Sequence, residues 1–148
     1  MNANATVAEI LNAKGRQTWT VSPENTVLEA IQMMADKNVG ALLVLDGGKL
    51  IGIISERDYT RKVILRGKAS KDTPVKEILS GTIIHVSPSN SVEECMRLMT
   101  SHRVRHLPVL EGDNVTGVVS IGDLVNWIIS AQTSTIHQLQ TYISWYPG

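Results

Sequence analysis

Two stretches of the chain carry apolar residues three or four positions apart. The positions are Val27, Ala30, Ile31 and Met34 in the first stretch, and Val92, Cys95, Met96 and Met99 in the second. Side chains at this spacing lie on one face of a helix, so both stretches predict amphipathic helices. Each begins at a capping box, a Ser or Thr followed three positions later by Glu. The capping boxes are Thr26 with Glu29 and Ser91 with Glu94, and Thr6 with Glu9 predicts a further helix start.

After each helix come two apolar, β-branched runs separated by a polar turn that contains glycine, which is typical of a β-hairpin. The runs are Leu42–Leu45 with Leu50–Ile54, and Leu107–Leu110 with Val115–Val119. A short strand is predicted before each helix, at Thr18–Val21 and Ile83–Val86, and a further helix after Ser55 and after Ser120. Each half is therefore predicted to be a β-α-β-β-α unit, and the fold class is α/β.

The two halves are copies of one unit. When the chain is shifted by 65 residues, 15 of the 39 pairs formed by positions 21–59 and 86–124 are identical, where ordinary composition gives about two or three. Two copies are too few for a solenoid, so we expect a closed pseudo-twofold pair. We assign residues 1–70 to the first repeat with an N-terminal helix and linker, and 71–131 to the second repeat.

Segments outside the repeat complete the predicted organisation. Between the copies, a basic stretch becomes a polar linker near Gly67, and Thr73 is expected to be an N-cap with Pro74 at the first helical position. Residues 132–148 are predicted to form a C-terminal amphipathic helix. Its apolar stripe is Ile136, Leu139, Ile143 and Tyr146.

Composition narrows the class of protein. The chain has 148 residues, with 14 Lys and Arg against 14 Asp and Glu, so it lacks the basic excess that non-specific binding to nucleic acid or anionic lipid needs. Cys95 is the only cysteine, which excludes an intrachain disulfide and a cysteine-rich zinc site. No secretory signal pattern is visible, and no apolar run approaches the roughly 18 residues of a membrane span. We therefore expect a soluble, cytoplasmic protein.

Three short motifs occur in a fixed order along the chain. Val-Ser-Pro opens each copy at 21–23 and 86–88, Arg-His-Leu-Pro-Val occupies 105–109, and Gly-x-x-Ser-x-x-Asp closes each copy at 52–58 and 117–123. This ordered set resembles the cystathionine-β-synthase (CBS) domain family over residues 7 to about 130. The chain looks like a stand-alone CBS pair of bacterial type.

The resemblance implies two pockets, each combining the closing motif of one copy with the strand starts of the other. Pocket A would comprise Ser55, Arg57, Asp58, Arg61, Ile84, Arg105, His106 and Pro108. Pocket B would comprise Thr20, Gly40, Ala41, Ser120, Gly122 and Asp123. Because the repeat pairs Arg57, Arg105 and His106 with Gly122, Gly40 and Ala41, we expect pocket A to hold a phosphorylated adenosine. Pocket B would be empty, weaker or occupied by a less charged group.

The resemblance also implies a function. Such a pair is expected to be a non-catalytic regulatory module that binds AMP, or alternatively ATP, ADP or NAD(H), with no metal required. It would signal occupancy to a partner protein, and we expect a homodimer. Physically, Asp58 could accept both ribose hydroxyls while the Ser55 hydroxyl and nearby backbone amides face a phosphate. Arg57 and Arg61, four apart on one helix face, could fork onto that phosphate.

Simpler interpretations stay open at this point. Ser55 with Asp58 is also a capping box, and Arg57 with Arg61 could be a solvated basic face. His102 and His106 have metal-pair spacing, but arginines lie between them. Trp19 could stack on adenine or pack in a core or interface, and Cys95 is interpreted as a small core residue.

Two rival functions remain. An adenine-nucleotide-processing enzyme is disfavoured because no nucleophile–base pair and no P-loop, Gly-x-Gly-x-x-Gly or Gly-x-Ser-x-Gly motif is found in the sequence. A nucleic-acid binder would use the basic stretch between Arg61 and Lys71, which is short and has no recognition module.

Overall fold

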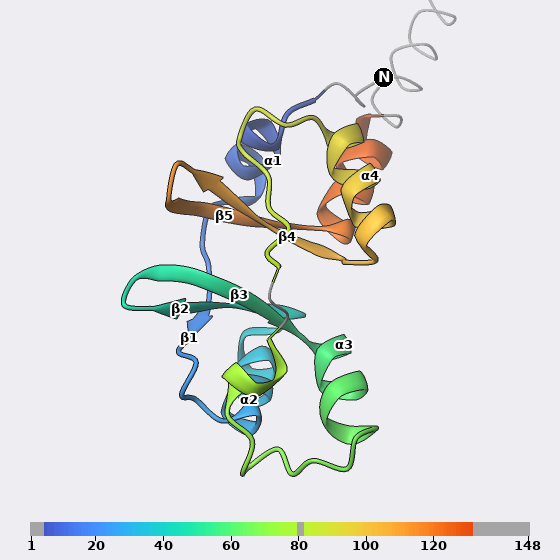
Figure 1. The fold of residues 1–148 in the computed structure, drawn as a ribbon. Coiled ribbons are helices and arrows are strands. Elements are labelled where there is room, and N and C mark those ends of the chain that lie inside the picture. Colours follow the sequence, from blue (N-terminus) through green and yellow to red (C-terminus); the bar gives the residue numbers. More distant parts are fainter. Residues whose placement is uncertain (1–4, 80–81, 132–148) are drawn as a thin grey trace, which may run out of the picture.

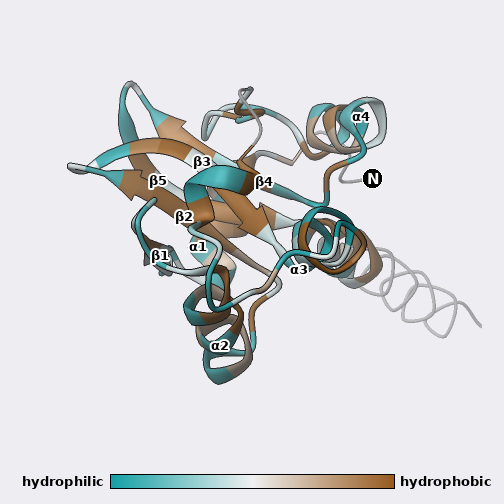
Figure 2. Ribbon diagram, turned by 60° about the horizontal axis from the view of Figure 1, so that its bottom comes forward, coloured by the Kyte–Doolittle hydropathy of each residue, from teal (hydrophilic) through white to brown (hydrophobic). Residues whose placement is uncertain are grey.

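The computed structural model describes residues 5–79 and 82–131 of the chain. Figure 1 shows two lobes, each a small sheet with helices packed against it, and the two sheets lie toward the middle of the molecule. Apolar residues are concentrated on the strands and on helix faces (Figure 2). Two clusters of buried apolar side chains form separate cores, one in each lobe.

The first lobe contains the first repeat. Its elements are β1 (Thr20–Val21), α2 (Val27–Lys37), β2 (Ala41–Asp46), β3 (Lys49–Ser55) and α3 (Glu56–Tyr59), which continues into the π-helix η2 (Thr60–Ile64). Strand β1 pairs with β2 in parallel, and β2 pairs with β3 in antiparallel. The predicted β-α-β-β-α order is confirmed here.

The second lobe repeats this arrangement with one difference. Its elements are α4 (Val92–His102), β4 (His106–Glu111), the antiparallel β5 (Asn114–Ser120) and a helix over 121–131. The strand predicted at Ile83–Val86 is reduced to one parallel bridge between Val86 and Val109. The backbone of Val86 still bonds to β4 on both sides, donating to Pro108 and accepting from Leu110.

Helix starts follow the predicted capping boxes. Thr6, Thr26 and Ser91 each accept a hydrogen bond from the backbone of the Glu three positions on, and that Glu accepts one from the cap backbone. The prediction for Thr73 is wrong. The 3₁₀ helix η3 (Val75–Ile78) has Pro74 at its N-cap position, and the Thr73 hydroxyl donates instead to the carbonyl of Ala69 at 2.7 Å.

Each lobe is covered by a segment that lies in the chain just before the other repeat. Helix α1 (Val7–Lys14) packs its buried residues into the core of the second lobe, whereas η3 packs into the core of the first lobe. The contacts correspond closely. A Cβ on Gly117 would lie 2.8 Å from Leu11 Cδ2, and a Cβ on Gly52 would lie 3.0 Å from Leu79 Cδ2. Glycine in β3 and β5 therefore lets a leucine close over each sheet, and α1 is a structural part of the second lobe.

Other expectations have mixed outcomes. Cys95 is buried in the core of the second lobe, which confirms its interpretation as a core residue, and burial raises the pKa of its thiol to about 11. The helix predicted at 132–148 lies outside the described residues. Within 5–79 and 82–131, no helix is long and apolar enough to cross a membrane.

Candidate functional site

The turn from β3 into α3 holds Ser55 and Asp58 together. Asp58 Oδ2 accepts hydrogen bonds from the Ser55 backbone N–H at 2.9 Å and the Ser55 hydroxyl at 3.0 Å. Its other oxygen, Oδ1, lies 3.4 Å from Lys62 Nζ, one helical turn farther along. The capping interpretation of this pair is therefore correct. A carboxylate has about four acceptor positions, so capping leaves room for a ligand hydroxyl.

The turn from β5 into the following helix has the same construction with a different cation. Asp123 Oδ2 accepts from the Ser120 backbone N–H at 2.8 Å, and the Ser120 hydroxyl accepts from the Asp123 N–H at 3.1 Å. The cation is Lys14, from the last turn of α1, whose Nζ lies 2.6 Å from Asp123 Oδ2. Lys14 also donates to the Val118 carbonyl at 2.8 Å. A segment outside the repeat thus supplies the partner of this carboxylate.

Most residues predicted for pocket A line one cavity of about 470 Å³ between the lobes. Its charged lining has five cationic side chains, Arg57, Arg61, Lys62, Arg103 and Arg105, against two carboxylates, Glu56 and Asp58. None of the four arginines forms an ion pair with any residue in the described ranges. Guanidinium groups gathered in this way repel one another, so the cavity is suited to an anion.

The arginines of this cavity come from both lobes. Arg57 and Arg61 belong to the helical segment after β3, and Arg57 Nη1 donates to the backbone carbonyl of Arg103 at 3.0 Å. Arg103 and Arg105 lie in the connection between α4 and β4. An anion held here would therefore contact the first and second repeats together.

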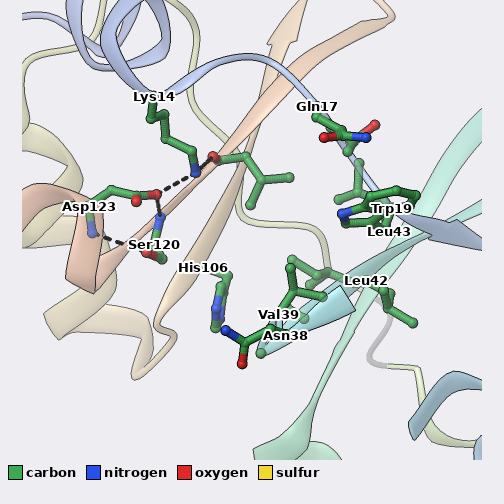
Figure 3. Close-up of a pocket in the computed structure, with 15 residues that line it drawn as sticks. Lys14, Gln17, Trp19, Asn38, Val39, Leu42, Leu43, His106, Ser120 and Asp123 are labelled. Atoms are coloured by element: carbon green, nitrogen blue, oxygen red, sulfur yellow. Dashed lines mark hydrogen bonds and ion pairs between the residues drawn. The ribbon is translucent and has the colours of Figure 1, made fainter. Parts of the chain in front are cut away.

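Part of predicted pocket B lines a second, smaller cavity of about 280 Å³ (Figure 3). Gly40, Ala41, Ser120 and Asp123 all contribute to it, and among the described residues Lys14 and Asp123 are its only charged lining. The indole of Trp19 lies across the cavity from Asp123, and Lys37 Nζ is 4.4 Å from the centroid of that ring. Since Lys14 neutralises Asp123, this cavity carries no net charge while His106 is uncharged.

His106 lines both cavities. Its imidazole lies against the backbone of Gly40, where a Cβ would approach Cε1 and Nε2 to 3.3 Å. Burial lowers the pKa of His106 below its usual value, and the charges of Lys14 and Arg105 act in the same direction. Asp123 and Glu56 oppose the shift. The two pockets are thus separated in part by a partly buried imidazole that favours its neutral form.

Four predicted residues do not line either cavity. Ile84 packs on the core of the second lobe, and Pro108 is buried in β4. Thr20 and Gly122 are exposed. In the other direction, the structure brings residues to the pockets that sequence reasoning missed, notably Arg103 and Lys62 in pocket A and Lys14 and Gln17 in pocket B.

The spacing of His102 and His106 is compatible with a pair of metal ligands. Within the described part of the chain, no group of three or more His, Cys, Asp or Glu side chains is arranged to hold an ion. Both histidines line the cavity of pocket A beside its arginines.

Comparison with known proteins gives a consistent family. A model of the CBS domain matches residues 7–65 and 75–130. The chain is 37% identical over 149 residues to the CBS domain-containing protein CBSX3, mitochondrial, of Arabidopsis thaliana, covering 95% of this chain and 72% of that protein. A solved CBS-domain protein from Burkholderia ambifaria superposes with a TM-score of 0.84 at 52% identity, over 86% of this chain and 96% of that one.

A more distant structure shares the fold. The CBS domain pair of protein MJ0100, solved in complex with 5′-methylthioadenosine and S-adenosyl-L-methionine, superposes with a TM-score of 0.76 at 22% identity. The match covers 86% of this chain and 98% of that one.

Proposed function

The chain belongs to the CBS domain family as a tandem pair, and we propose that it is a non-catalytic sensor that binds an adenine nucleotide in pocket A. The ligand is AMP, with ATP, ADP and NAD(H) as the alternatives of the same class. Occupancy is signalled to a partner protein. Pocket B takes a weaker or less charged ligand, and neither site requires a metal.

The charge of pocket A carries this proposal. Four arginines from two lobes surround one cavity without an ion-pair partner in the described ranges. A phosphate group offsets their mutual repulsion and accepts the charge-assisted, forked hydrogen bonds that guanidinium groups make best. In pocket B the charged lining is one lysine already paired with one carboxylate, which suits a ligand without phosphate.

The nucleoside part of the ligand is assigned to the Ser-x-x-Asp turn. Asp58 caps α3 through Oδ2, and within the described ranges Oδ1 makes only a 3.4 Å contact to Lys62, so it retains acceptor capacity for ribose hydroxyls. The same fold holds adenosine-containing ligands in the MJ0100 complex. Of the residues predicted for pocket A, Ser55, Arg57, Asp58, Arg61, Arg105 and His106 remain in the proposed site, whereas Ile84 and Pro108 support it through the core.

The rival functions are less favoured. A processing enzyme needs a nucleophile or base poised at the reacting atom, and Asp58, one of the two carboxylates of pocket A, uses Oδ2 to cap α3. A nucleic-acid binder would use the basic stretch after Arg61, yet Lys62 and Lys68 of that stretch pair with Asp58 and Glu77. Signalling by a binding module requires a ligand that favours one conformation or partner over another.

The proposed oligomeric state relies on apolar residues at the surface. We propose a cytoplasmic homodimer, since twofold pairs are the commonest oligomers. Exposed apolar side chains suited to such contacts are Leu28, Ile64, Leu65, Val125 and Ile129.

Calorimetric titration with AMP tests the proposal. The wild-type chain should bind one AMP tightly, and Asp58→Asn should weaken that binding at least about tenfold because a charged acceptor of the ribose hydroxyls is lost. Asp123→Asn, the matched substitution in pocket B, should change it by less than twofold. Equal losses in the two variants would contradict the asymmetry, and a wild-type chain that binds none of AMP, ADP, ATP or NAD(H) would contradict the function.

A further inference from the structure

Arg103 has a backbone conformation that its side chain does not favour. It forms the C-cap of α4 with φ 54° and ψ 43°, in the left-handed region. The repeat pairs it with Asn38, the C-cap of α2, at φ 55° and ψ 48°. Glycine has no Cβ to clash with the following carbonyl, and the short polar side chain of asparagine offsets that clash through local hydrogen bonds, whereas arginine has neither advantage. The same backbone feature is thus built from a favourable residue in one repeat and an unfavourable one in the other.

Local interactions do not explain why arginine occupies this position. The cap is made by the Arg103 backbone, whose N–H donates to the carbonyl of Met99. The Arg103 carbonyl accepts from Arg57, and any residue would supply that carbonyl. The guanidinium forms no hydrogen bond or ion pair with the described residues 5–79 and 82–131. It lines pocket A.

We propose that Arg103 is a phosphate-binding residue of pocket A and that its backbone strain is retained for this purpose. Strained residues cluster at binding sites, where the surrounding structure holds them. Arg103 lines the pocket from the second lobe and Arg57 from the first, and Arg57 Nη1 donates to the Arg103 carbonyl at 3.0 Å. A phosphate between them would contact both lobes, so the affinity of pocket A would depend on the position of one lobe relative to the other. This inference rests on the proposed function and adds a specificity residue to it.

The proposal predicts two effects of opposite sign from one substitution. Arg103→Asn places in the second repeat the residue that the first repeat already has. It should raise Tm by roughly 2–4 °C, because the left-handed conformation is no longer strained. It should also weaken AMP binding about tenfold, because a charge-assisted bond to phosphate is lost. Adenosine, which has no phosphate, should bind as to the wild type within twofold.

The matched control is Asn38→Gly, which changes the equivalent cap of the first repeat and should leave AMP affinity unchanged. Arg103→Lys keeps the charge and the strain, so it should retain most of the affinity without raising Tm. Calorimetry with AMP and with adenosine, together with thermal unfolding of each variant, gives all the readouts. Unchanged AMP affinity in Arg103→Asn would overturn the proposal, as would an equal loss for AMP and adenosine. A fall in Tm would overturn the claim of strain.

Inorganic pyrophosphate separates this inference from the proposed function. If the wild-type chain binds pyrophosphate and Arg103→Asn weakens that binding, the role of Arg103 stands even where no adenine nucleotide binds. If AMP binds the wild type and the variant equally, the proposed function stands and the role of Arg103 falls.

Discussion

Pocket A and pocket B are built from the same repeated unit, but their charges come from different parts of the chain. In pocket A the cations belong to the repeats themselves, as arginines on the helical segment after β3 and in the connection before β4. In pocket B the positions matching Arg57 and Arg105 are Gly122 and Gly40, and the only cationic side chain among the described lining residues is Lys14 of α1.

The difference shows how duplication can produce two unequal sites. The scaffold is kept, since both closing turns hold the same Ser–Asp pair and both sheets accept a leucine over a glycine. Only side chains around the pocket change. One site gains unpaired positive charge, and the other becomes internally neutral through a helix that covers the second lobe.

The largest expected effect comes from truncating the two leucines that cover the sheets, Leu11 over β5 and Leu79 over β3. Leu11 is fully buried between α1 and β5, so Leu11→Ala should lower the free energy of unfolding by about 2–5 kcal/mol. Leu79, which covers the first lobe, is only partly buried, so Leu79→Ala should cost less. Chemical denaturation of both variants measures the two losses.

Leu11→Ala also tests whether the position of α1 holds Lys14 against Asp123 in pocket B. Loosening α1 should disturb the Lys14–Asp123 contact, whereas AMP binding in pocket A should survive in any folded Leu11→Ala protein. An equal or greater loss of stability for Leu79→Ala would show that the burial of the two leucines does not determine the size of the loss.

The second prediction concerns His106, the titratable residue that lines both pockets. An unfolded histidine takes up a proton near pH 6.5, whereas burial lowers the pKa of the folded His106. Between these values the unfolded state binds more protons, so stability should fall as the pH drops below about 6.5. The charged groups facing the imidazole are Asp123, Glu56, Lys14 and Arg105.

Thermal unfolding of the wild type and of His106→Gln between pH 5 and 8 measures this contribution. The variant should lose less stability on acidification than the wild type. His102→Gln, which changes an exposed histidine at the end of α4, serves as the control and should retain the wild-type profile. Identical profiles for His106→Gln and the wild type would show that the imidazole is not the group responsible.

Much of the fold could be predicted because local signals agree with the final packing. The capping boxes at Thr26 and Ser91 and the hairpin turns lie where the sequence places them. The predicted strand at Ile83–Val86 failed because its backbone makes only one bridge. The N-cap at Thr73 failed because the hydroxyl donates to Ala69 instead. At Thr73 a local partner thus competed with an otherwise valid pattern, whereas at Ile83–Val86 the pairing with β4 is present but limited to Val86.

The site was harder to predict than the fold. The motif positions Ser55, Asp58, Ser120 and Asp123 line the two cavities, because strand-to-helix turns place them at the ends of the sheets. Lys14 could not be found by comparing the copies, since α1 precedes the aligned region. Arg103 did carry a signal, because the repeat aligns it with Asn38 just after a helix. An arginine in a position that favours asparagine or glycine indicates a role for the side chain beyond the cap that its backbone forms.

The smallest effect should come from Lys14→Met, which bears most directly on pocket B. The Lys14–Asp123 pair is partly exposed, with side-chain exposures of 36% and 22%, so its loss should lower stability by less than about 1 kcal/mol. Without the ammonium, Asp123 has no cation competing for its oxygens, and adenosine should bind pocket B several-fold more tightly. Titration with adenosine measures the gain, which Asp123→Asn in the same background should remove.

Lys62→Met is the matched change in pocket A, because Lys62 likewise contacts an aspartate and donates to a carbonyl, that of Ile78. Weaker adenosine binding in Lys14→Met would mean that Lys14 holds the ligand itself, and the neutrality of pocket B would then not explain its selectivity.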